Sequence, residues 1–379
     1  MPPVTIPLIK ADLPALAEVA DSFDRILRSG RISNFGPFLT EFEEQTGAYL
    51  GTETVTVSSG TMGLLFVLQA LGLQPNQKVI VPSFTFMATA QAIVYAGGIP
   101  IFAEANEDLL LSVSDLEFLL KKHPDAAMVL PVHTYGLPCP TNEIDTLVAS
   151  FAQRRSRPIP IIYDAAHAFG AARGGVRVGG AGNAEIFSLS VTKTLVSVEG
   201  GLISTRDAAL ANRLRKMRNY GIESNYDAFW PGLNGKMSEF HAVIGLANLK
   251  NIDKILQQRQ KMAEYYLRRI EEQTRFKTLR PPADVVHTYK DLTVLVPEAQ
   301  IHQRARLMEL LREEGIETRA YFSPPVHQQK RFAPYADRPL PQTERLAQRV
   351  ITLPFFTTIQ EEQMDRVVKA LAEAERKLP

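Results

Sequence analysis

The stretch Ile186–Gly201 reads IFSLSVTKTLVSVEGG and joins an apolar, strand-like run to a pair of glycines. Two hydroxyl residues, Ser188 and Ser190, lie on the run, and a single lysine, Lys193, follows it directly. A lysine in a pocket of low dielectric constant has a lowered pKa, because desolvation disfavours the charged amine. Its neutral amine can attack an aldehyde and form a Schiff base. The alternative is a lysine at the edge of a loop, neutralised by Glu199.

Apolar runs of this kind recur along the first two thirds of the chain. They are VTVSS from residue 55, KVIVPS from 78, IPIFAE from 99, AAMVLPVH from 126, IPIIYDAAH from 159, AEIFSLS from 184 and GGLIST from 200. Most are continuous rather than alternating, as expected for strands that are covered on both faces. Helical stretches such as TMGLLFVLQALG and SVSDLEFLLKKH lie between many of them. The pattern predicts an α/β fold with a mainly parallel sheet, and a ligand site at the carboxyl ends of the strands.

The pattern changes at Ser238. From there to Gln273 the chain has no proline, and apolar residues return every three or four positions, which predicts one long or twice-broken helix between two domains. YKDLTVLV and IETRAYF then resemble strands of a smaller α+β domain, and EEQMDRVVKALAEAERKL resembles a closing amphipathic helix. We therefore expect a large domain over residues 1–250 and a small C-terminal domain over residues 251–379.

Bulk composition excludes several classes of partner. The 379 residues are 45% apolar and 22% charged with a net charge of +1, so neither nucleic acid nor an anionic membrane is expected as a partner. Residues 79–103 are uncharged, but prolines, glycines and polar residues interrupt them, which predicts strand, loop, helix, turn and strand rather than a membrane span. Cys139 is the only cysteine, which excludes an intrachain disulfide and, with no secretory signal at the N-terminus, fits a cytoplasmic protein.

Two further motifs lie at strand ends. VSSGTMG, residues 57–63, combines a strand end, a small polar turn and a helix start, which is typical of a phosphate site, although a simple N-cap by Ser59 or Thr61 is the alternative. IIYDAAHAFG places Asp164 at the end of a buried strand, where its carboxylate needs a pyridinium N–H, a metal or a backbone group as partner. His167 follows, but the seven histidines are scattered without a familiar metal spacing, so no metal is expected.

A phosphate turn, a strand-end aspartate and a lysine are together the three groups that hold pyridoxal 5′-phosphate (PLP). The turn would bind the phosphate, and Ser188 could add a hydrogen bond to it. Asp164 would keep the ring nitrogen protonated, so that the ring can act as an electron sink. Lys193 would form the Schiff base with the aldehyde.

With these motifs, the chain resembles the DegT/StrS-type PLP-dependent sugar aminotransferases of the fold-type I aspartate aminotransferase superfamily. The matching stretches include SSGTMGLLFVLQALGL, PVHTYGLP, YDAAHAFGA, FSLSVTK, EGGLIST, RNYGI and LNGKMSEFHAVIGL, in the order that the family has them. The resemblance covers nearly the whole chain, from SNFGPFLTEFEE to YFSPPVH and the C-terminal helix. It implies a three-layer α/β/α PLP-binding domain around a seven-stranded sheet, followed by a smaller α+β domain.

The resemblance also implies a role for each matching residue. Lys193, Asp164 and His167 match the catalytic positions, and Ser188 matches the phosphate serine. The other implied cofactor contacts are Thr61 and Met62 in the phosphate turn, Phe86 stacked on the ring, and Asn234, which would reach the cofactor phosphate of a partner subunit. The implied substrate contacts are Phe35, Lys236, Tyr321 and His327.

Three residues depart from the family pattern. His167 stands where many members have Gln near the ring hydroxyl of the cofactor; both donate a hydrogen bond, but histidine can also titrate. Gly235 stands where an aromatic residue is frequent, and Lys236 stands where Arg is frequent. These departures concern the specificity for the sugar more than the binding of PLP.

The resemblance implies a two-stage reaction in a homodimer with shared active sites. An amino donor, usually L-glutamate, would give its nitrogen to PLP and leave as 2-oxoglutarate, and a nucleotide-linked keto-sugar would then accept the amine. The product would be an amino sugar for a surface glycan or an antibiotic. The alternatives are a cyclitol or another keto substrate, a dehydratase, which would carry histidine in place of Lys193, and a non-catalytic regulator that keeps the fold.

Overall fold

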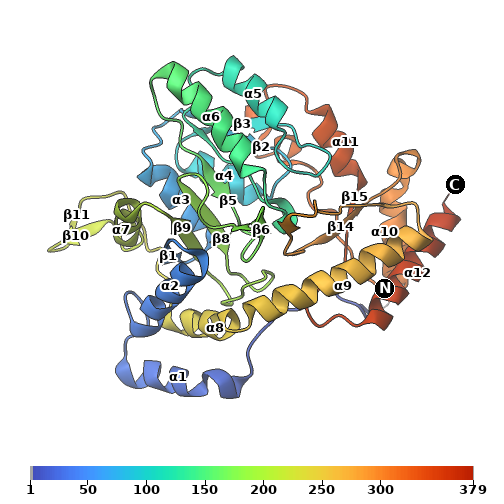
Figure 1. Cartoon of the computed structure of the whole chain (residues 1–379), viewed down its shortest axis with the longest axis horizontal. Coiled ribbons are helices and arrows are strands. Elements are labelled where there is room, and N and C mark those ends of the chain that lie inside the picture. Colours follow the sequence, from blue (N-terminus) through green and yellow to red (C-terminus); the bar gives the residue numbers. More distant parts are fainter. Residues whose placement is uncertain (1–2, 379) are drawn as a thin grey trace.

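The computed structural model describes residues 3–378, and a single seven-stranded sheet lies at its centre (Figure 1). The strands are β1 (Glu53–Val57), β2 (Lys78–Pro82), β3 (Ile99–Ala103), β4 (Met128–Val129), β5 (Ile162–Asp164), β8 (Ala184–Ser188) and β9 (Gly201–Thr205). Two groups, β1-β9-β8-β5 and β3-β2-β4, are joined by parallel bridges from Val129 to Ile161 and from Val132 to Asp164. Only β9 is antiparallel to its neighbours, so the predicted mainly parallel sheet is confirmed.

Helices cover both faces of this sheet. One face packs against α3 (Gly60–Ala70), α4 (Met87–Tyr95) and α7 (Ala208–Met217), and the other against α2 (Pro37–Leu50), α5 (Val113–Lys122), α6 (Thr141–Arg155) and α8 (Glu239–Leu249). Successive residues of β2 show why: Val79 and Val81 lie in the core on one face of the sheet and Ile80 in the core on the other face. Because both faces of each strand are buried, the strands read as continuous apolar runs, and the expected three-layer arrangement is confirmed. The helix α1 (Leu16–Ser29) lies outside α8 (Figure 1).

The helix predicted over residues 238–273 is two helices, α8 and α9 (Ile252–Gln273), broken once at Lys250 and Asn251. Beyond α9 lies a second hydrophobic core. It contains the antiparallel sheet β12 (Lys277–Thr278), β14 (Leu292–Leu295) and β15 (Val350–Leu353), with α10 (Arg304–Glu313) and the predicted closing helix, α12 (Glu361–Lys377).

The strand predicted from IETRAYF is not formed. Ile316 instead makes an isolated bridge with Ile6, and Arg319 makes one with Thr352. Pro324 and Pro325 follow this segment, and because proline has no N–H to donate, the pairing cannot continue in that direction.

The chain crosses between the two cores more than once. Ile6 lies in the second core, beyond α9. Val326, Phe332 and Leu340, which come later in the chain, lie instead in the core between the central sheet and α3, α4 and α7. The carboxylate of Glu104, next to β3, accepts hydrogen bonds from the N–H groups of Gln342 and Thr343 in the first turn of α11 (Pro341–Arg349). Residues 1–250 and 251–379 are therefore kept as a proposed division, with a few segments that pack across it.

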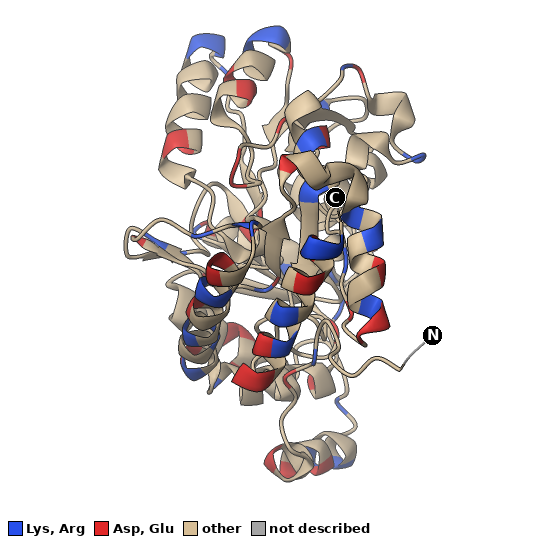
Figure 2. Ribbon diagram, turned by 90° about the vertical axis from the view of Figure 1, so that its right-hand side faces the viewer, with Lys and Arg blue, Asp and Glu red and all other residues tan. Residues whose placement is uncertain are grey.

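Along the helices, positions of Lys and Arg alternate with positions of Asp and Glu instead of forming separate stretches of one charge (Figure 2). This distribution agrees with the net charge of +1. Within residues 3–378, no helix has the length and apolar character needed to cross a membrane.

Candidate active site

Lys193 lies in a cavity of about 370 Å³ at the carboxyl ends of the central strands. The chain turns directly after β8, where the Lys193 N–H donates to the carbonyl of Ser190 at 2.9 Å, and this turn directs the side chain inward. Burial and the charge of Lys290 lower the pKa of Lys193 from 10.5 to about 7, against the opposing effect of Asp291, Asp164 and Glu199. A substantial fraction of Lys193 is therefore a neutral amine near pH 7, as a nucleophile requires.

Asp164 ends β5 and lines the same cavity. Its Oδ2 accepts a hydrogen bond of 2.8 Å from Thr89 Oγ1 on α4, and its Oδ1 accepts one of 3.0 Å from the Ala166 N–H. Burial raises the pKa of this carboxyl, and the two hydrogen bonds oppose that rise. A cationic ring N–H facing the carboxylate would compensate its burial, so the position suits a pyridinium partner.

The first turn of α3 forms another wall of the cavity. Ser59 is the N-cap, and its side chain accepts a hydrogen bond of 3.1 Å from the Met62 N–H, so that N–H already has a partner within the chain. Thr61 lines the cavity, as predicted for the phosphate turn, whereas Met62 is not among the lining residues. A Cβ on Gly60 would come within 3.1 Å of the Cβ of Ser188, so glycine lets this turn approach the end of β8 closely. A helix N-terminus with free N–H groups suits an anion, so the prediction that this turn binds the cofactor phosphate fits the geometry.

Aromatic rings and an imidazole complete the wall beside Asp164. Phe86, the N-cap residue of α4, is 51% exposed and faces the cavity, as a ring that stacks on a cofactor must. His167 lines the cavity and lies nearly parallel to Phe322, with ring centroids 6.4 Å apart. Burial, with the charges of Lys193 and Lys290, lowers the pKa of His167 well below its usual range. The imidazole is therefore neutral near pH 7.

Lys290 and Asp291 also line the cavity, although the sequence pattern of YKDLTVLV predicts only a strand there. They precede β14 in the second core, and the fold brings them to Lys193. Ser59, Thr89, Glu199 and Phe322 also line the cavity. A signal was available for Lys290 and Asp291, because two adjacent charges at the start of an apolar strand require a polar partner.

The predicted substrate residues do not all reach this cavity. Tyr321 lines it, but His327 is buried elsewhere, with Nδ1 2.6 Å from Ser83 Oγ and Nε2 3.2 Å from Glu344 Oε1. Both ring nitrogens of His327 thus have protein partners, which leaves it a structural role here.

Phe35, Asn234 and Lys236 lie outside the cavity of their own chain. Lys236 Nζ lies 4.6 Å above the ring of Tyr220, and Asn234 is exposed. A Cβ on Gly235 would come within 2.4 Å of Phe66, so the aromatic residue that is frequent here in the family would require Phe66 to move.

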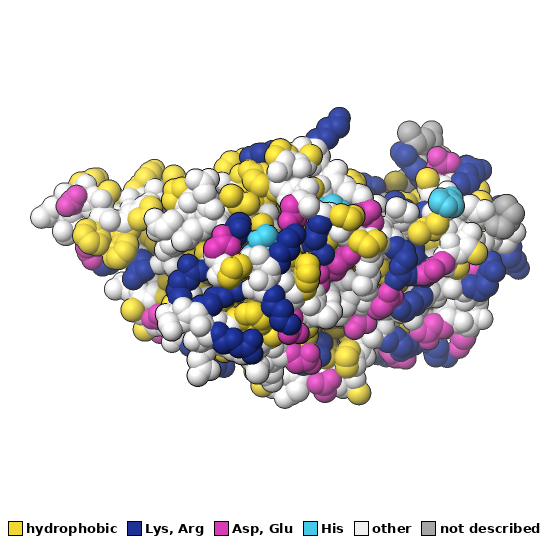
Figure 3. All heavy atoms as spheres, turned by 90° about the horizontal axis from the view of Figure 1, so that it is seen from above, with side chains coloured by type: hydrophobic (Ala, Val, Ile, Leu, Met, Phe, Trp, Pro, Cys, Tyr) yellow, Lys and Arg dark blue, Asp and Glu magenta, His cyan; other side chains and the backbone are white. Residues whose placement is uncertain are grey.

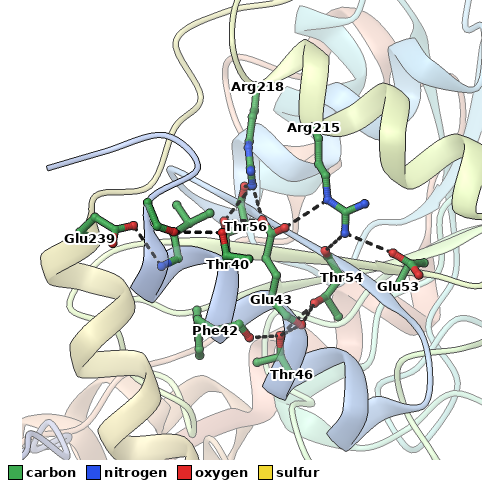
Figure 4. Close-up of polar contacts among 12 residues, drawn as sticks. Thr40, Phe42, Glu43, Thr46, Glu53, Thr54, Thr56, Arg215, Arg218 and Glu239 are labelled. Carbon is green, nitrogen blue, oxygen red and sulfur yellow. Dashed lines mark hydrogen bonds and ion pairs between the residues drawn. The ribbon is translucent and has the colours of Figure 1, made fainter. Parts of the chain in front are cut away.

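A buried ionic cluster supports the segment that carries Phe35 (Figure 4). Glu43 on α2 lies between Arg218 and Arg215, and Arg218 also donates to the carbonyl and hydroxyl of Thr56 on β1 at 2.8 and 2.9 Å. The guanidinium of Arg218 lies 4.9 Å from the Phe35 ring. The cluster therefore holds α2, β1 and the C-terminal end of α7 together next to Phe35.

Glu239, at the start of α8, caps the neighbouring helix α2. Its carboxylate accepts hydrogen bonds from the N–H groups of Phe38 and Leu39 at 2.9 and 3.0 Å. A Cβ on Gly36 would come within 2.3 Å of this carboxylate, so only glycine allows the approach. The cap fixes the direction in which the Phe35 segment enters α2.

Comparison with known proteins identifies the class. The sequence profile of the DegT/DnrJ/EryC1/StrS aminotransferase family matches residues 16–372. The chain is 33% identical over 319 residues to a UDP-N-acetyl-3-dehydro-alpha-D-glucosamine 3-aminotransferase of Acidithiobacillus ferrooxidans, covering 84% of this chain and 83% of that protein. It is also 33% identical over 356 residues to GDP-perosamine synthase of Escherichia coli O157:H7, and the match covers 92% of this chain and 93% of that protein.

A solved structure agrees. The sugar aminotransferase CalS13 from Micromonospora echinospora superposes with a TM-score of 0.89 at 26% identity, covering 97% of this chain and all of that one (100%). The chain belongs to the DegT/DnrJ/EryC1/StrS aminotransferase family. Its activity class is that of the PLP-dependent aminotransferases, and its fold is the PLP fold type I, as the sequence predicted.

The residues of the cavity fit the cofactor of this class. A cavity of about 370 Å³ holds a near-neutral amine, a buried carboxylate with one face toward the cavity, an exposed aromatic ring and a helix N-terminus. Among the described residues, no group of three His, Cys, Asp or Glu side chains could hold a metal ion. Lys193, Asp164, Phe86, Thr61 and Ser188 are the residues that would hold PLP.

Proposed function

We propose that this protein transfers the amino group of L-glutamate to a nucleotide-linked keto-sugar. The observation that carries the proposal is the placement of Lys193, whose pKa is about 7, in one cavity with the buried carboxylate of Asp164. PLP, when bound, supplies an electron sink that stabilises negative charge on the carbon next to the transferred nitrogen.

The chain's own residues divide the remaining work. Lys193 would hold the cofactor, and its amine would move a proton between the reacting carbon atoms as general acid and base. Asp164, held by Thr89 and Ala166, would keep a cationic ring nitrogen in place. His167, neutral near pH 7, would donate a hydrogen bond to the ring oxygen of the cofactor. Tyr321, which lines the cavity, is the proposed contact to the sugar.

The relatives support a nucleotide-linked acceptor, because their names carry UDP and GDP sugars. The nucleotide differs between them, so the particular sugar is a matter for experiment. A dehydratase would have histidine at position 193, and this chain has lysine. A cyclitol or another keto compound is the alternative acceptor. The single cysteine agrees with a cytoplasmic enzyme.

We propose further that the enzyme is a homodimer with shared sites. Large apolar residues are exposed beside Asn234, including Tyr220, Phe229 and Leu233, and Tyr226 is 95% exposed in the hairpin of β10 (Ile222–Ser224) and β11 (Asp227–Ala228). Hydrophobic side chains gather at this end of the molecule, on the left of Figure 3. Exposed aromatic residues of this kind are typical of interface cores. Asn234, Lys236 and Phe35 lie outside their own cavity and would complete that of the partner.

The test combines a label and a substrate panel. Borohydride reduction of the purified enzyme, followed by peptide mapping, should place the pyridoxyl group on Lys193, and Lys193→Ala should lose both the cofactor absorption band and turnover. Candidate amino-sugar nucleotides and aminocyclitols are then each supplied with 2-oxoglutarate, and the keto product is detected by mass. A label on another lysine overturns the site, whereas conversion of an aminocyclitol alone overturns the proposed acceptor.

A further inference from the structure

The cavity contains a second buried ammonium that the proposed steps do not use. Lys290 is 6% exposed and Asp291 is 4% exposed, and both line the cavity that holds Lys193. Lys290 Nζ donates to Asp291 Oδ1 at 2.8 Å, and it lies 5.8 Å from the centre of the Tyr321 ring. The backbone holds the pair in place, because the Lys290 N–H donates to the Tyr135 carbonyl at 3.0 Å.

This ion pair is incompletely satisfied by the protein. Asp291 Oδ2 is buried and has no hydrogen-bond partner within residues 3–378, and His167 Nδ1 lies 3.9 Å from it, beyond hydrogen-bond distance. A buried carboxylate oxygen without a donor costs free energy, so the arrangement is unfavourable for folding alone. The pair therefore resembles half of a binding site, with one positive and one negative group directed at a small ligand.

An amino acid is the ligand that fits this pair of charges. Its ammonium complements Asp291, and its carboxylate complements Lys290. The carboxylate carbon of an α-amino acid is two bonds from the nitrogen, so a donor whose nitrogen reaches the position of Lys193 Nζ brings its carboxylate into the same cavity. Apart from Lys193, Lys290 is the only Lys or Arg that the described residues of the same chain contribute to the cavity lining.

The burial of Lys290 distinguishes the donor from the acceptor. A nucleotide-linked sugar carries its negative charge on a bulky pyrophosphate, which needs an accessible cation. Lys290 is more than nine-tenths buried, so a small carboxylate is the anion that it can contact. We infer that Lys290, paired with Asp291, binds the α-carboxylate of the amino donor, which makes it a residue that determines donor specificity. This inference rests on the proposed transamination.

Two amines that differ only in the carboxylate provide the test. 2-Aminoisobutyrate carries an α-carboxylate, whereas isopropylamine has the same carbon skeleton without it, and neither has to be turned over. Each is titrated into the PLP-loaded enzyme, and the dissociation constant is read from the change in cofactor absorption. In Lys290→Met, the dissociation constant of 2-aminoisobutyrate should rise about 10- to 100-fold, the loss expected for a charge-assisted hydrogen bond, and that of isopropylamine should change less than about 3-fold.

The variants keep the result interpretable. Lys290→Arg should retain most of the affinity for 2-aminoisobutyrate, and Lys254→Met, which changes an exposed lysine on α9, serves as the matched control. If Lys290→Met does not fold, the double variant Lys290→Met/Asp291→Asn removes both charges and is titrated instead. Equal changes for the two amines, or no change for either, would overturn the inference.

A third titration separates this inference from the proposed donor. 2-Methylglutamate adds the glutamate side chain to the same α-carboxylate and amine. If it binds no more tightly than 2-aminoisobutyrate, glutamate is not the preferred donor, while the role of Lys290 stands on the first pair. If the acceptor panel gives no sugar product, the titrations still report on Lys290.

Discussion

Thr89 Oγ1 donates a hydrogen bond of 2.8 Å to Asp164 Oδ2, so that the helix after β2 fixes a carboxylate at the end of β5. The Thr89 hydroxyl also lies 2.9 Å from the Thr85 hydroxyl, and all three side chains are buried. A carboxylate held in this way keeps its orientation when a cation faces it.

The first prediction uses this relationship. Asp164→Asn should keep the fold but lower kcat by about 10²- to 10³-fold, because an amide cannot stabilise a cationic ring nitrogen. Thr89→Val removes one hydrogen bond to this carboxylate and should lower kcat by about 10-fold. Steady-state kinetics and circular dichroism check both. An Asp164→Asn enzyme within a few-fold of the wild type would show that the carboxylate is structural.

The second prediction concerns His167. Its neutral imidazole is expected to donate a hydrogen bond to the ring oxygen of the cofactor, and Gln donates one as well, so His167→Gln should keep its activity within about 10-fold. His167→Ala, which cannot donate this hydrogen bond, should lose more activity than His167→Gln. Loss of all activity in the Gln variant, with PLP still bound, would instead indicate proton transfer by the imidazole.

The third prediction concerns pH and the cofactor-free protein. The pKa of Lys193 is about 7 in the folded chain against 10.5 for a free lysine, so between these values the unfolded chain binds the extra proton. The free energy of unfolding should therefore rise with pH in this window, by up to about 1.4 kcal/mol per pH unit. Lys193→Met should remove this contribution.

Urea unfolding at pH 7, 8 and 9 measures the difference between the two proteins. The groups that act on Lys193 are Lys290, Asp291, Asp164 and Glu199, and all remain in the variant. If the free energy of unfolding changes with pH by the same amount in the wild type and in Lys193→Met, the Lys193 ammonium is not desolvated in the cofactor-free protein.

The fourth prediction concerns assembly. Lys193→Ala and Asn234→Asp should each be inactive or nearly so, and mixing them should restore activity. If sites are shared, a hybrid dimer contains one site that bears neither substitution. Activity is measured after subunit exchange, which is followed with differently tagged chains. If the subunits exchange but activity does not return, Asn234 acts in the active site of its own chain.

The fifth prediction concerns the cluster in Figure 4. Arg218 is 1% exposed, and its loss leaves the Glu43 carboxylate with fewer partners. Arg218→Met should lower the free energy of unfolding by about 3 to 5 kcal/mol, the cost of breaking a buried ion pair. Arg28→Met, at an exposed pair on α1, should change it by less than about 0.5 kcal/mol. A loss below about 1 kcal/mol for Arg218→Met would show that water or a partner group compensates Glu43.

Sequence patterns predicted the central sheet because each strand is buried on both faces and therefore forms an unbroken apolar run. Asp164 and Lys193 could be predicted because Asp164 ends its strand and Lys193 follows its own strand by a few residues, so the strand ends bring them together. The single break at Lys250 and Asn251 could not be located, because the apolar spacing continues across it.

Contacts between residues far apart in the chain could not be predicted from the sequence. Lys290 and Asp291 directly precede β14, and only the packing of the C-terminal core against the central sheet brings them to Lys193. His327 was expected at the substrate, but its two partners, Ser83 and Glu344, come from distant parts of the chain and hold it in the interior. No local pattern encodes either arrangement.

The origin of the cavity walls has a consequence for laboratory evolution. Within the cavity of one chain, the groups that fit PLP lie between residues 59 and 193, whereas Lys290, Asp291, Tyr321 and Phe322 come from a later part of the chain. A saturation library confined to these four later positions would vary the reactants that the enzyme accepts and leave the coenzyme-binding side untouched. Retained coenzyme absorbance would then serve as a rapid screen for folded clones before any substrate is tried.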